Sequence, residues 1–193
     1  MFLARDGDVL IEFQHERIHE WPPEGGVSTL CRSVSLEKGV DARARSAALI
    51  KALKWTGVAM VEYRYDESAQ TYCLMEINGR FWGSLPLAIG AGVPFAAALV
   101  GICGRGDEPS RWRRTYREID CVFGLPEVKR LLQVLLGRGE IQDPFYRVTP
   151  WRDLTRYLRA MLRRSTVFYV FEWRDMGPFF GDLRNMVCKV LRQ

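Results

Sequence analysis

The sequence predicts an α+β fold in which helices flank an antiparallel β-sheet and a mostly helical segment follows. Paired apolar runs of strand length surround short turn segments at residues 2–13 and 58–80. A pattern of period 3.6 between them predicts a helix, and further helical patterns dominate after residue 125. With 193 residues, 48% of them hydrophobic and 26% charged, the chain has the composition of a globular protein.

The N-terminal part predicts four extended segments. Two strands, residues 2–5 and 9–13, are joined by Asp6-Gly7-Asp8, a typical hairpin turn. The chain then continues extended and polar over residues 14–20, and residues 28–34 form another predicted strand. We therefore expect a small sheet to begin the fold.

Three helices are predicted around the central hairpin. The first runs from Asp41, its expected N-cap, to Trp55. The segments 85–90 and 95–103 predict two short helices with a break at Gly92-Val93-Pro94. Residues 81–103 carry no charge, but prolines and glycines divide them, so we expect a buried helix pair and no membrane span.

The C-terminal part predicts three more helices and one strand. The helix 127–136 is expected to direct an apolar face inward, made of Val128, Leu131, Leu132 and Leu135. The helix 151–164 has one apolar face, with Leu154, Tyr157, Leu158, Met161 and Leu162, and a basic remainder. A strand at 166–171 and a last helix at 182–191 complete the prediction.

The charge is unevenly distributed along the chain. Residues 1–104 carry 10 basic and 12 acidic side chains, whereas residues 105–193 carry 18 and 11. This difference predicts two domains, 1–104 and 105–193. The arginines at 111, 113, 114 and 117, with aromatic residues between them, resemble the composition of nucleic-acid-binding surfaces. Since no nucleic-acid-binding module accompanies them, we expect a solvated basic surface instead.

The five cysteines show neither paired spacing nor a zinc-binding pattern. Most stand in apolar surroundings and predict buried thiols in a reducing compartment. The N-terminus has only a short apolar run before Arg5, Asp6 and Asp8, so no signal peptide is expected. Together these observations predict a cytoplasmic protein.

Residues 58–80 predict a β-hairpin that carries the candidate site. Folding this segment about Ala69 places Glu62 opposite Glu76 and Tyr63 opposite Met75. In that register one face is suited to a core and carries Val61, Tyr63, Tyr65, Cys73, Met75 and Ile77. The other face is polar and carries Glu62, Arg64, Glu76 and Asn78.

Two glutamates directly opposite each other repel unless positive charge lies between them. Carboxylate and amide oxygens are the ligands that Mg²⁺ prefers, and Mg²⁺ often binds together with substrate phosphates. The hairpin therefore predicts a metal site at Glu62, Glu76 and Asn78. The alternative is a solvated outer face on which Arg64 supplies the neighbouring counter-charge.

The hairpin also resembles the metal-binding hairpin of the ATP-grasp superfamily, which includes biotin carboxylase and carbamoyl phosphate synthetase. The likeness rests on Glu62, on Glu76-Ile77-Asn78 followed by Arg80, and on the downstream segment 90–95. It implies that Glu62, Glu76 and Asn78 hold Mg²⁺ or Mn²⁺ ions that bridge the phosphates of ATP. It also implies that Arg80 is catalytic and faces the reacting centre.

The preceding strand extends this likeness. In the family, a matching strand carries basic side chains that face the acid substrate, and His15 and Arg17 occupy those positions here. The resemblance implies a catalytic role for Arg17 and a cofactor-binding role for His15. The alternative is that both are exposed strand residues without a role in a site.

The likeness covers residues 1–104 and corresponds to the C-terminal subdomain of the family fold. Complete enzymes of the family also have a preceding domain and a subdomain that supplies a lysine and a glycine-rich lid. We therefore expect the metal- and ATP-binding part of a carboxylate ligase, with ATP and a small carboxylic acid as its ligands. Three accounts stay open: the sequence is a fragment of a longer enzyme, it works with a second polypeptide that supplies the other half of the site, or it is a degenerate relative used for binding. The alternative is a non-catalytic interaction protein whose basic tail binds an acidic partner or membrane surface.

Overall fold

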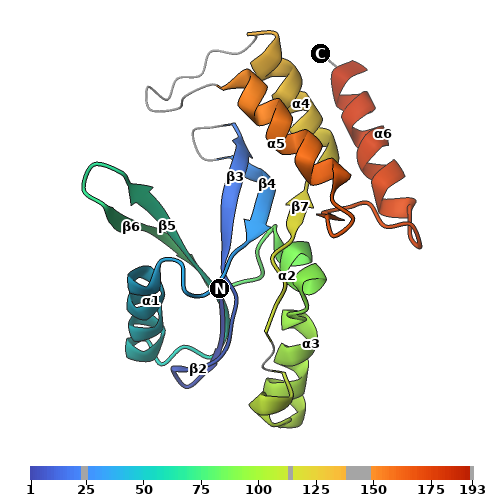
Figure 1. The fold of residues 1–193 in the computed structure, drawn as a ribbon. Helices are drawn as coiled ribbons and strands as arrows, with labels where there is room; N and C mark the ends of the chain where they lie inside the picture. The colour runs from blue at the N-terminus through green and yellow to red at the C-terminus, as the bar shows by residue number, and fades with distance from the viewer. Residues whose placement is uncertain (23–25, 113–114, 138–148, 192–193) are drawn as a thin grey trace. The chain divides into compact units, whose positions relative to one another are not determined.

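The computed structural model describes residues 1–22, 26–112, 115–137 and 149–191. These residues form an α+β fold with two four-stranded, mostly antiparallel sheets and six α-helices, as the sequence predicts (Figure 1). The chain divides into two compact units. The first combines Met1–Glu16 with Ser33–Glu118, and the second combines Arg17–Arg32 with Ile119–Gln193. The predicted domain boundary near residue 104 stays a prediction.

The sheet of the first unit has the strand order β2-β1-β5-β6. It consists of β1 (Phe2–Arg5), β2 (Asp8–Glu12), β5 (Gly57–Asp66) and β6 (Thr71–Asn78), all antiparallel to their neighbours. Asp6 and Gly7 join β1 to β2 with φ angles of 52° and 88°. This pair of positive φ angles is typical of a tight hairpin turn, so the predicted first hairpin is confirmed.

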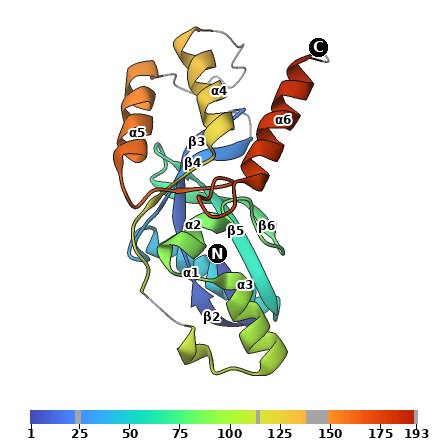
Figure 2. The same cartoon turned by 90° about the vertical axis from the view of Figure 1, so that its right-hand side faces the viewer.

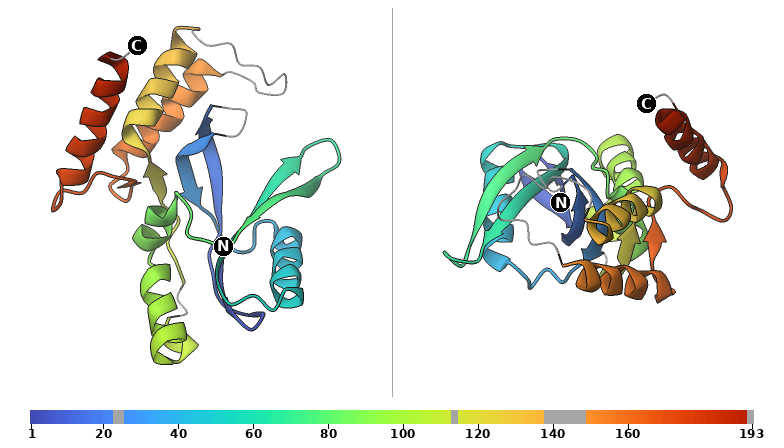
Figure 3. Two further views of the ribbon diagram at one scale, coloured as in Figure 1. Left: turned by 180° about the vertical axis from the view of Figure 1, so that it is seen from behind. Right: turned by 90° about the horizontal axis from the view of Figure 1, so that it is seen from above.

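Helix α1 (Val40–Ala52) packs on this sheet (Figure 3). Its buried Ile50 contacts Phe2, Ala4 and Ala59 in one core cluster. The predicted N-cap is wrong, because Gly39 in the left-handed conformation precedes the helix and Asp41 lies in its first turn. An acidic side chain there is still favourable, since the helix N-terminus carries partial positive charge.

The uncharged segment forms the expected pair of short helices. These are α2 (Leu85–Ala91) and α3 (Phe95–Leu99), and a π-helical turn, Val100–Gly104, continues α3 (Figure 2). Their buried side chains include Leu87, Phe95 and Ile102. In the part of the chain that the structure describes, no single helix could span a membrane by length and composition. The α2–α3 pair reaches that length only with a bend of 87°.

The second sheet has the order β3-β4-β7-β8 and is formed by β3 (His15–Trp21), β4 (Val27–Ser33), β7 (Asp120–Val122) and β8 (Val167–Phe168). Strand β4 is antiparallel to β7, whereas β7 is parallel to β8. The sequence analysis did not predict β7, because three residues are too few to show a period of two. The predicted strand at 166–171 is reduced to the two residues of β8.

Helices α4 (Gly124–Leu135) and α5 (Pro150–Leu162) lie side by side in the second unit, and α6 (Gly177–Leu191) follows β8. The inward face predicted for α4 is wrong except at Leu131. Val128, Leu132 and Leu135 are 41%, 53% and 40% exposed. The buried side chains of α4 are instead Glu127, Arg130, Leu131 and Val134.

The thiols are less buried than predicted. Cys31 and Cys121 are buried, whereas Cys73, Cys103 and Cys188 are exposed, and all five are free. Cys31 and Cys121 are direct partners on β4 and β7, where neighbouring strands cover them.

Candidate metal and nucleotide site

The hairpin β5–β6 brings the two predicted glutamates together. Glu62 lies directly opposite Glu76, and Met60 lies directly opposite Asn78. Because side chains of opposed residues share one face of a sheet, the two carboxylates stand on the same face. Asn78 follows Glu76 by two residues and therefore belongs to that face as well. The predicted register is thus confirmed at this end of the hairpin.

Beyond Glu62 the predicted register is wrong. A β-bulge shifts the pairing, so that Tyr63 lies opposite Leu74 and Met75 is the extra residue of β6. An extra residue reverses which face the following side chains occupy. Cys73, predicted on the apolar face, therefore lies opposite Arg64 on the face of the glutamates.

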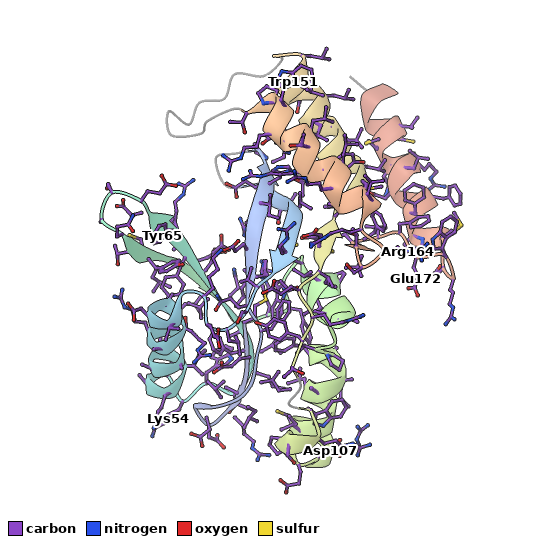
Figure 4. The ribbon with its side chains drawn as sticks, viewed as in Figure 1. Lys54, Tyr65, Asp107, Trp151, Arg164 and Glu172 are labelled. Atoms are coloured by element: carbon purple, nitrogen blue, oxygen red, sulfur yellow. The ribbon has the colours of Figure 1, made fainter. Side chains whose placement is uncertain are left out.

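Beyond the bulge, tyrosines supply the apolar face of the hairpin. Tyr72 lies opposite Tyr65, with ring centroids 4.9 Å apart, and contacts Tyr63 edge to face at 6.4 Å. Figure 4 labels Tyr65 on this part of the hairpin. Met75 and Ile77 are 58% and 39% exposed, so neither belongs to the core that the sequence predicted for them.

Asn78 orients the carboxylate of Glu76. Its Nδ2 donates a hydrogen bond of 2.6 Å to Oε1 of Glu76. Since the amide nitrogen serves this bond, the amide oxygen is the atom of Asn78 that remains for a cation. Glu62 and Asn78 are partly buried, and Glu76 is exposed, so a ligand from solution has access to the group.

The donor set fits Mg²⁺ in chemistry. Two carboxylates and one amide oxygen are hard ligands, and Mg²⁺ completes its octahedral shell with water and phosphate oxygens. Among the residues that the structure describes, no three side chains of His, Cys, Asp or Glu are grouped to hold a metal by themselves.

The predicted basic residues have other immediate partners. Arg80, two residues after β6, donates from Nη1 to the carbonyl oxygen of Phe81 at 3.0 Å and is exposed. Nε2 of His15 lies 3.2 Å from Oγ of Ser84. Both residues belong to the unit that holds the hairpin.

Arg17 belongs to the other unit, where its Nη1 lies 3.3 Å from Oε2 of Glu20. The catalytic roles of Arg80 and Arg17, the cofactor-binding role of His15 and the metal-binding roles of Glu62, Glu76 and Asn78 stay predictions.

A second group of charged residues was missed by the sequence analysis. His19 of β3, Glu127 and Arg130 of α4, and Asp153 of α5 form a buried polar cluster. Arg130 donates to Oε2 and Oε1 of Glu127 at 3.0 and 2.9 Å and to Oδ2 of Asp153 at 2.9 Å. Nδ1 of His19 lies 2.7 Å from Oε1 of Glu127. The side chains of Glu127 and Arg130 are completely buried.

Burial and pairing act in opposite directions in this polar cluster. Burial disfavours the charge of Glu127, but the hydrogen bonds with His19 and Arg130 outweigh it and lower the pKa of Glu127. Burial likewise disfavours the charge of Arg130, and the carboxylates of Glu127 and Asp153 outweigh it and raise the pKa of Arg130. Glu127 and Arg130 are therefore both charged at neutral pH. Their enclosure excludes substrate, so the cluster is structural.

One sequence signal could have revealed half of the cluster. Glu127 and Arg130 are three residues apart, the spacing at which oppositely charged side chains meet on one helix. His19 and Asp153 are distant in sequence, and no local pattern connects them with α4.

Comparison with known proteins gives a family match for the region around the hairpin. A family model described as "Carbamoyl-phosphate synthase L chain, ATP binding domain" matches residues 33–105. The match is less than half of the chain. It contains Glu62, Glu76, Asn78 and Arg80, and it leaves out His15 and Arg17. No curated protein and no solved structure gives a significant match. The ATP-grasp resemblance is confirmed for residues 33–105.

Proposed function

We propose that the region similar to the ATP-grasp ATP-binding domain is the metal- and ATP-binding part of an ATP-dependent carboxylate ligase. The observation that carries this proposal is the pairing of Glu62 with Glu76, with Asn78 on the same face. All three residues lie within the matched segment. Two like charges directly opposite each other on a sheet repel, and a bound cation would attract both.

The proposed reaction has two steps. The γ-phosphoryl group of ATP passes to a substrate carboxylate, giving an acyl phosphate and ADP, and an amine or thiol then displaces phosphate. Mg²⁺ or Mn²⁺, when bound, offsets the negative charge of the ATP phosphates. Glu62 and Glu76 would hold the ion through their carboxylates and Asn78 through its amide oxygen. The hydrogen bond from Asn78 would keep Glu76 turned toward the site.

Arg80 is proposed to bind the oxygens of the acyl phosphate. Its guanidinium is a planar fork of donors that suits phosphate geometry. One nitrogen, Nη1, is used by the carbonyl oxygen of Phe81, and this bond fixes the side chain beside the end of β6. Arg17 would bind the acid substrate, and His15 would contact the cofactor. A second polypeptide or a further segment would supply the groups that grip the phosphates.

The test compares the parent with Glu76→Gln in thermal unfolding, with EDTA and with millimolar Mg²⁺, each with and without ATP. Without metal, Glu76→Gln should be as stable as the parent or more stable by about 0.2–1 kcal/mol, because one repulsion is removed. Mg²⁺ with ATP should stabilise the parent by mass action and Glu76→Gln much less. The same preparation should show no appreciable ATP turnover with carboxylate and amine substrates.

Glu67→Gln is the matched control, because Glu67 is an exposed glutamate of the same hairpin outside the pair. It should respond to Mg²⁺ and ATP as the parent does. If the parent shows no response, the hairpin is a structural element only. The interaction protein, with a basic tail that binds an acidic partner, would then be the better explanation.

A further inference from the structure

The apolar face of α5 is directed toward solvent. An amphipathic helix of a globular protein normally turns this face to the core, but the buried residues of α5 are Asp153 and Ala160. Trp151, Leu158 and Leu162 are 77%, 48% and 83% exposed. These three residues are seven and four positions apart, so they lie along one side of the helix. They form an apolar stripe on the outer surface of α5.

A row of arginines runs beside the apolar stripe. Its members are spaced by three or four residues, which places them on one side of the helix; they are Arg152, Arg156, Arg159 and, at the C-cap, Arg163. Arg163 is paired with Asp120, whereas the other three make no ion pair with any residue that the structure describes. The one acidic residue of α5, Asp153, is buried and paired with Arg130. No carboxylate of the helix therefore offsets the positive charge of its outer surface.

This combination is typical of helices that lie flat on an anionic membrane surface. In such helices Trp and Leu side chains enter the boundary between headgroups and acyl chains, and basic residues beside them attract anionic lipids. Tryptophan is enriched at that depth. Arginine suits phosphate geometry, and its long side chain can reach the headgroups while its stem lies on apolar surface.

The length of α5 favours a helix that lies on the membrane surface and does not cross it. Its 13 residues give a length of about 20 Å, whereas the hydrocarbon core of a bilayer is about 30 Å thick. The apolar stripe and the arginine row both run from the first turn to the last. Figure 4 shows Trp151 at the start of the helix and Arg164 just beyond its end. Both ends could therefore contact the same surface.

We propose that the outer surface of α5 is a docking site for an anionic lipid surface. The charge of the arginine row selects the sign of that surface, and the exposed leucines and tryptophan select a bilayer, into which they can insert. The site lies outside residues 33–105 and uses none of the residues of the proposed ligase site. Its test is therefore independent of the proposed function.

The experiment measures binding of the full chain to vesicles by flotation. Vesicles with equal amounts of phosphatidylcholine and phosphatidylserine should bind the parent, and phosphatidylcholine alone should bind it about tenfold more weakly or less. Leu162→Gln should weaken binding to the anionic vesicles about tenfold, because a leucine no longer leaves water. Arg159→Gln should weaken it about fivefold, the effect of one basic residue near the surface.

Matched controls come from α1. Leu53 at its C-cap is 55% exposed, and Arg45 is exposed within it. Leu53→Gln and Arg45→Gln make the same chemical changes away from α5, so both should bind the anionic vesicles as the parent does. Circular dichroism checks that each variant is folded. If Leu162→Gln does not fold, Leu158→Gln carries the same comparison.

Four results would overturn the proposal. The first is no binding of the parent to the anionic vesicles, and the second is equal binding to phosphatidylcholine alone. The third is parent-like binding by Leu162→Gln, which would show that the apolar stripe does not enter the bilayer. The fourth is displacement of the parent from the anionic vesicles by a polyglutamate peptide that binds it more tightly, because the occupant of the surface would then be an acidic polypeptide.

Discussion

Replacing Arg130 by methionine should destabilise the second unit more than any substitution on the surface of α4. Methionine keeps much of the apolar length of the side chain and removes the charge. The carboxylates of Glu127 and Asp153 would then stay in a buried place without their counter-charge. At the wild-type residue, three hydrogen bonds of 2.9–3.0 Å connect the guanidinium with these two groups.

The expected loss follows from burial. The side chains of Arg130 and Glu127 have no exposed area, and that of Asp153 is 6% exposed. Removal of one partner of a buried ion pair costs about 3–5 kcal/mol, because the remaining charge is left uncompensated. Total stabilities of domains are about 5–15 kcal/mol. Arg130→Met should therefore remove a large fraction of the free energy of unfolding of this unit.

Urea unfolding followed by circular dichroism measures this loss. Lys129→Met is the matched control, because Lys129 is the exposed neighbour of Arg130 on α4, and it should change the free energy of unfolding by less than about 0.5 kcal/mol. A second comparison removes all three charges together, in Glu127→Leu, Arg130→Met and Asp153→Leu. Apolar replacement of a whole buried ion network is often neutral or stabilising, so this triple variant should recover much of the loss.

A loss below about 1 kcal/mol for Arg130→Met would refute the reasoning, since a desolvated ion pair cannot be broken so cheaply. A triple variant less stable than Arg130→Met would also contradict it. In that case the carboxylates would contribute through contacts other than their pairing with the guanidinium.

Three further predictions concern the pH dependence of stability and the first turn. Because the pKa of Glu127 is lowered in the folded protein, its contribution is complete above its unfolded pKa of about 4.3. That contribution is lost as pH falls through the folded pKa, so Glu127→Gln should flatten the acid limb of urea unfolding. Burial raises the pKa of Tyr116 to about 12 and also raises the pKa of Tyr157 and Tyr169, so stability should fall as pH rises above about 10; Tyr116→Phe should reduce this fall, and ultraviolet titration should show one late tyrosine fewer than in the parent. Gly7 has a φ of 88° and its added Cβ would meet the carbonyl oxygen of Lys51 at 2.9 Å, so Gly7→Ala should lower the free energy of unfolding by at least about 1–2 kcal/mol.

Most strands and helices could be predicted from the sequence, because their signals are local. The turn Asp6-Gly7, with apolar runs on either side, indicated the first hairpin. The pairing of Glu62 with Glu76 followed from the position of the turn alone. The bulge at Met75 could not be predicted in the same way, since nothing in the local sequence requires an extra residue there. Its consequence, the exchange of faces at Cys73, was therefore missed.

Helix α4 shows a different limit of prediction. Its leucines and valine have the period of a buried face, yet Leu132 and Val128 are exposed. The helix is instead turned so that Glu127 and Arg130 meet His19 and Asp153, residues that come from β3 and α5. A hydrophobic pattern cannot report partners so distant in sequence. The ion pairs and hydrogen bonds of this polar cluster outweighed the apolar pattern of α4.

The two charged groups of the chain differ in a way that separates a ligand site from a structural one. In the polar cluster, unlike charges meet in a buried place, and the positive charge of Arg130 compensates the carboxylates of Glu127 and Asp153. At the hairpin, two like charges meet on an accessible face, and Asn78 orients one of them without contributing charge. Repulsion between the two carboxylates destabilises the folded hairpin. A cation bound to phosphate would offset this repulsion. The paired glutamates are therefore the place where binding of metal and nucleotide should change the free energy of unfolding, whereas the buried polar cluster should not respond to either.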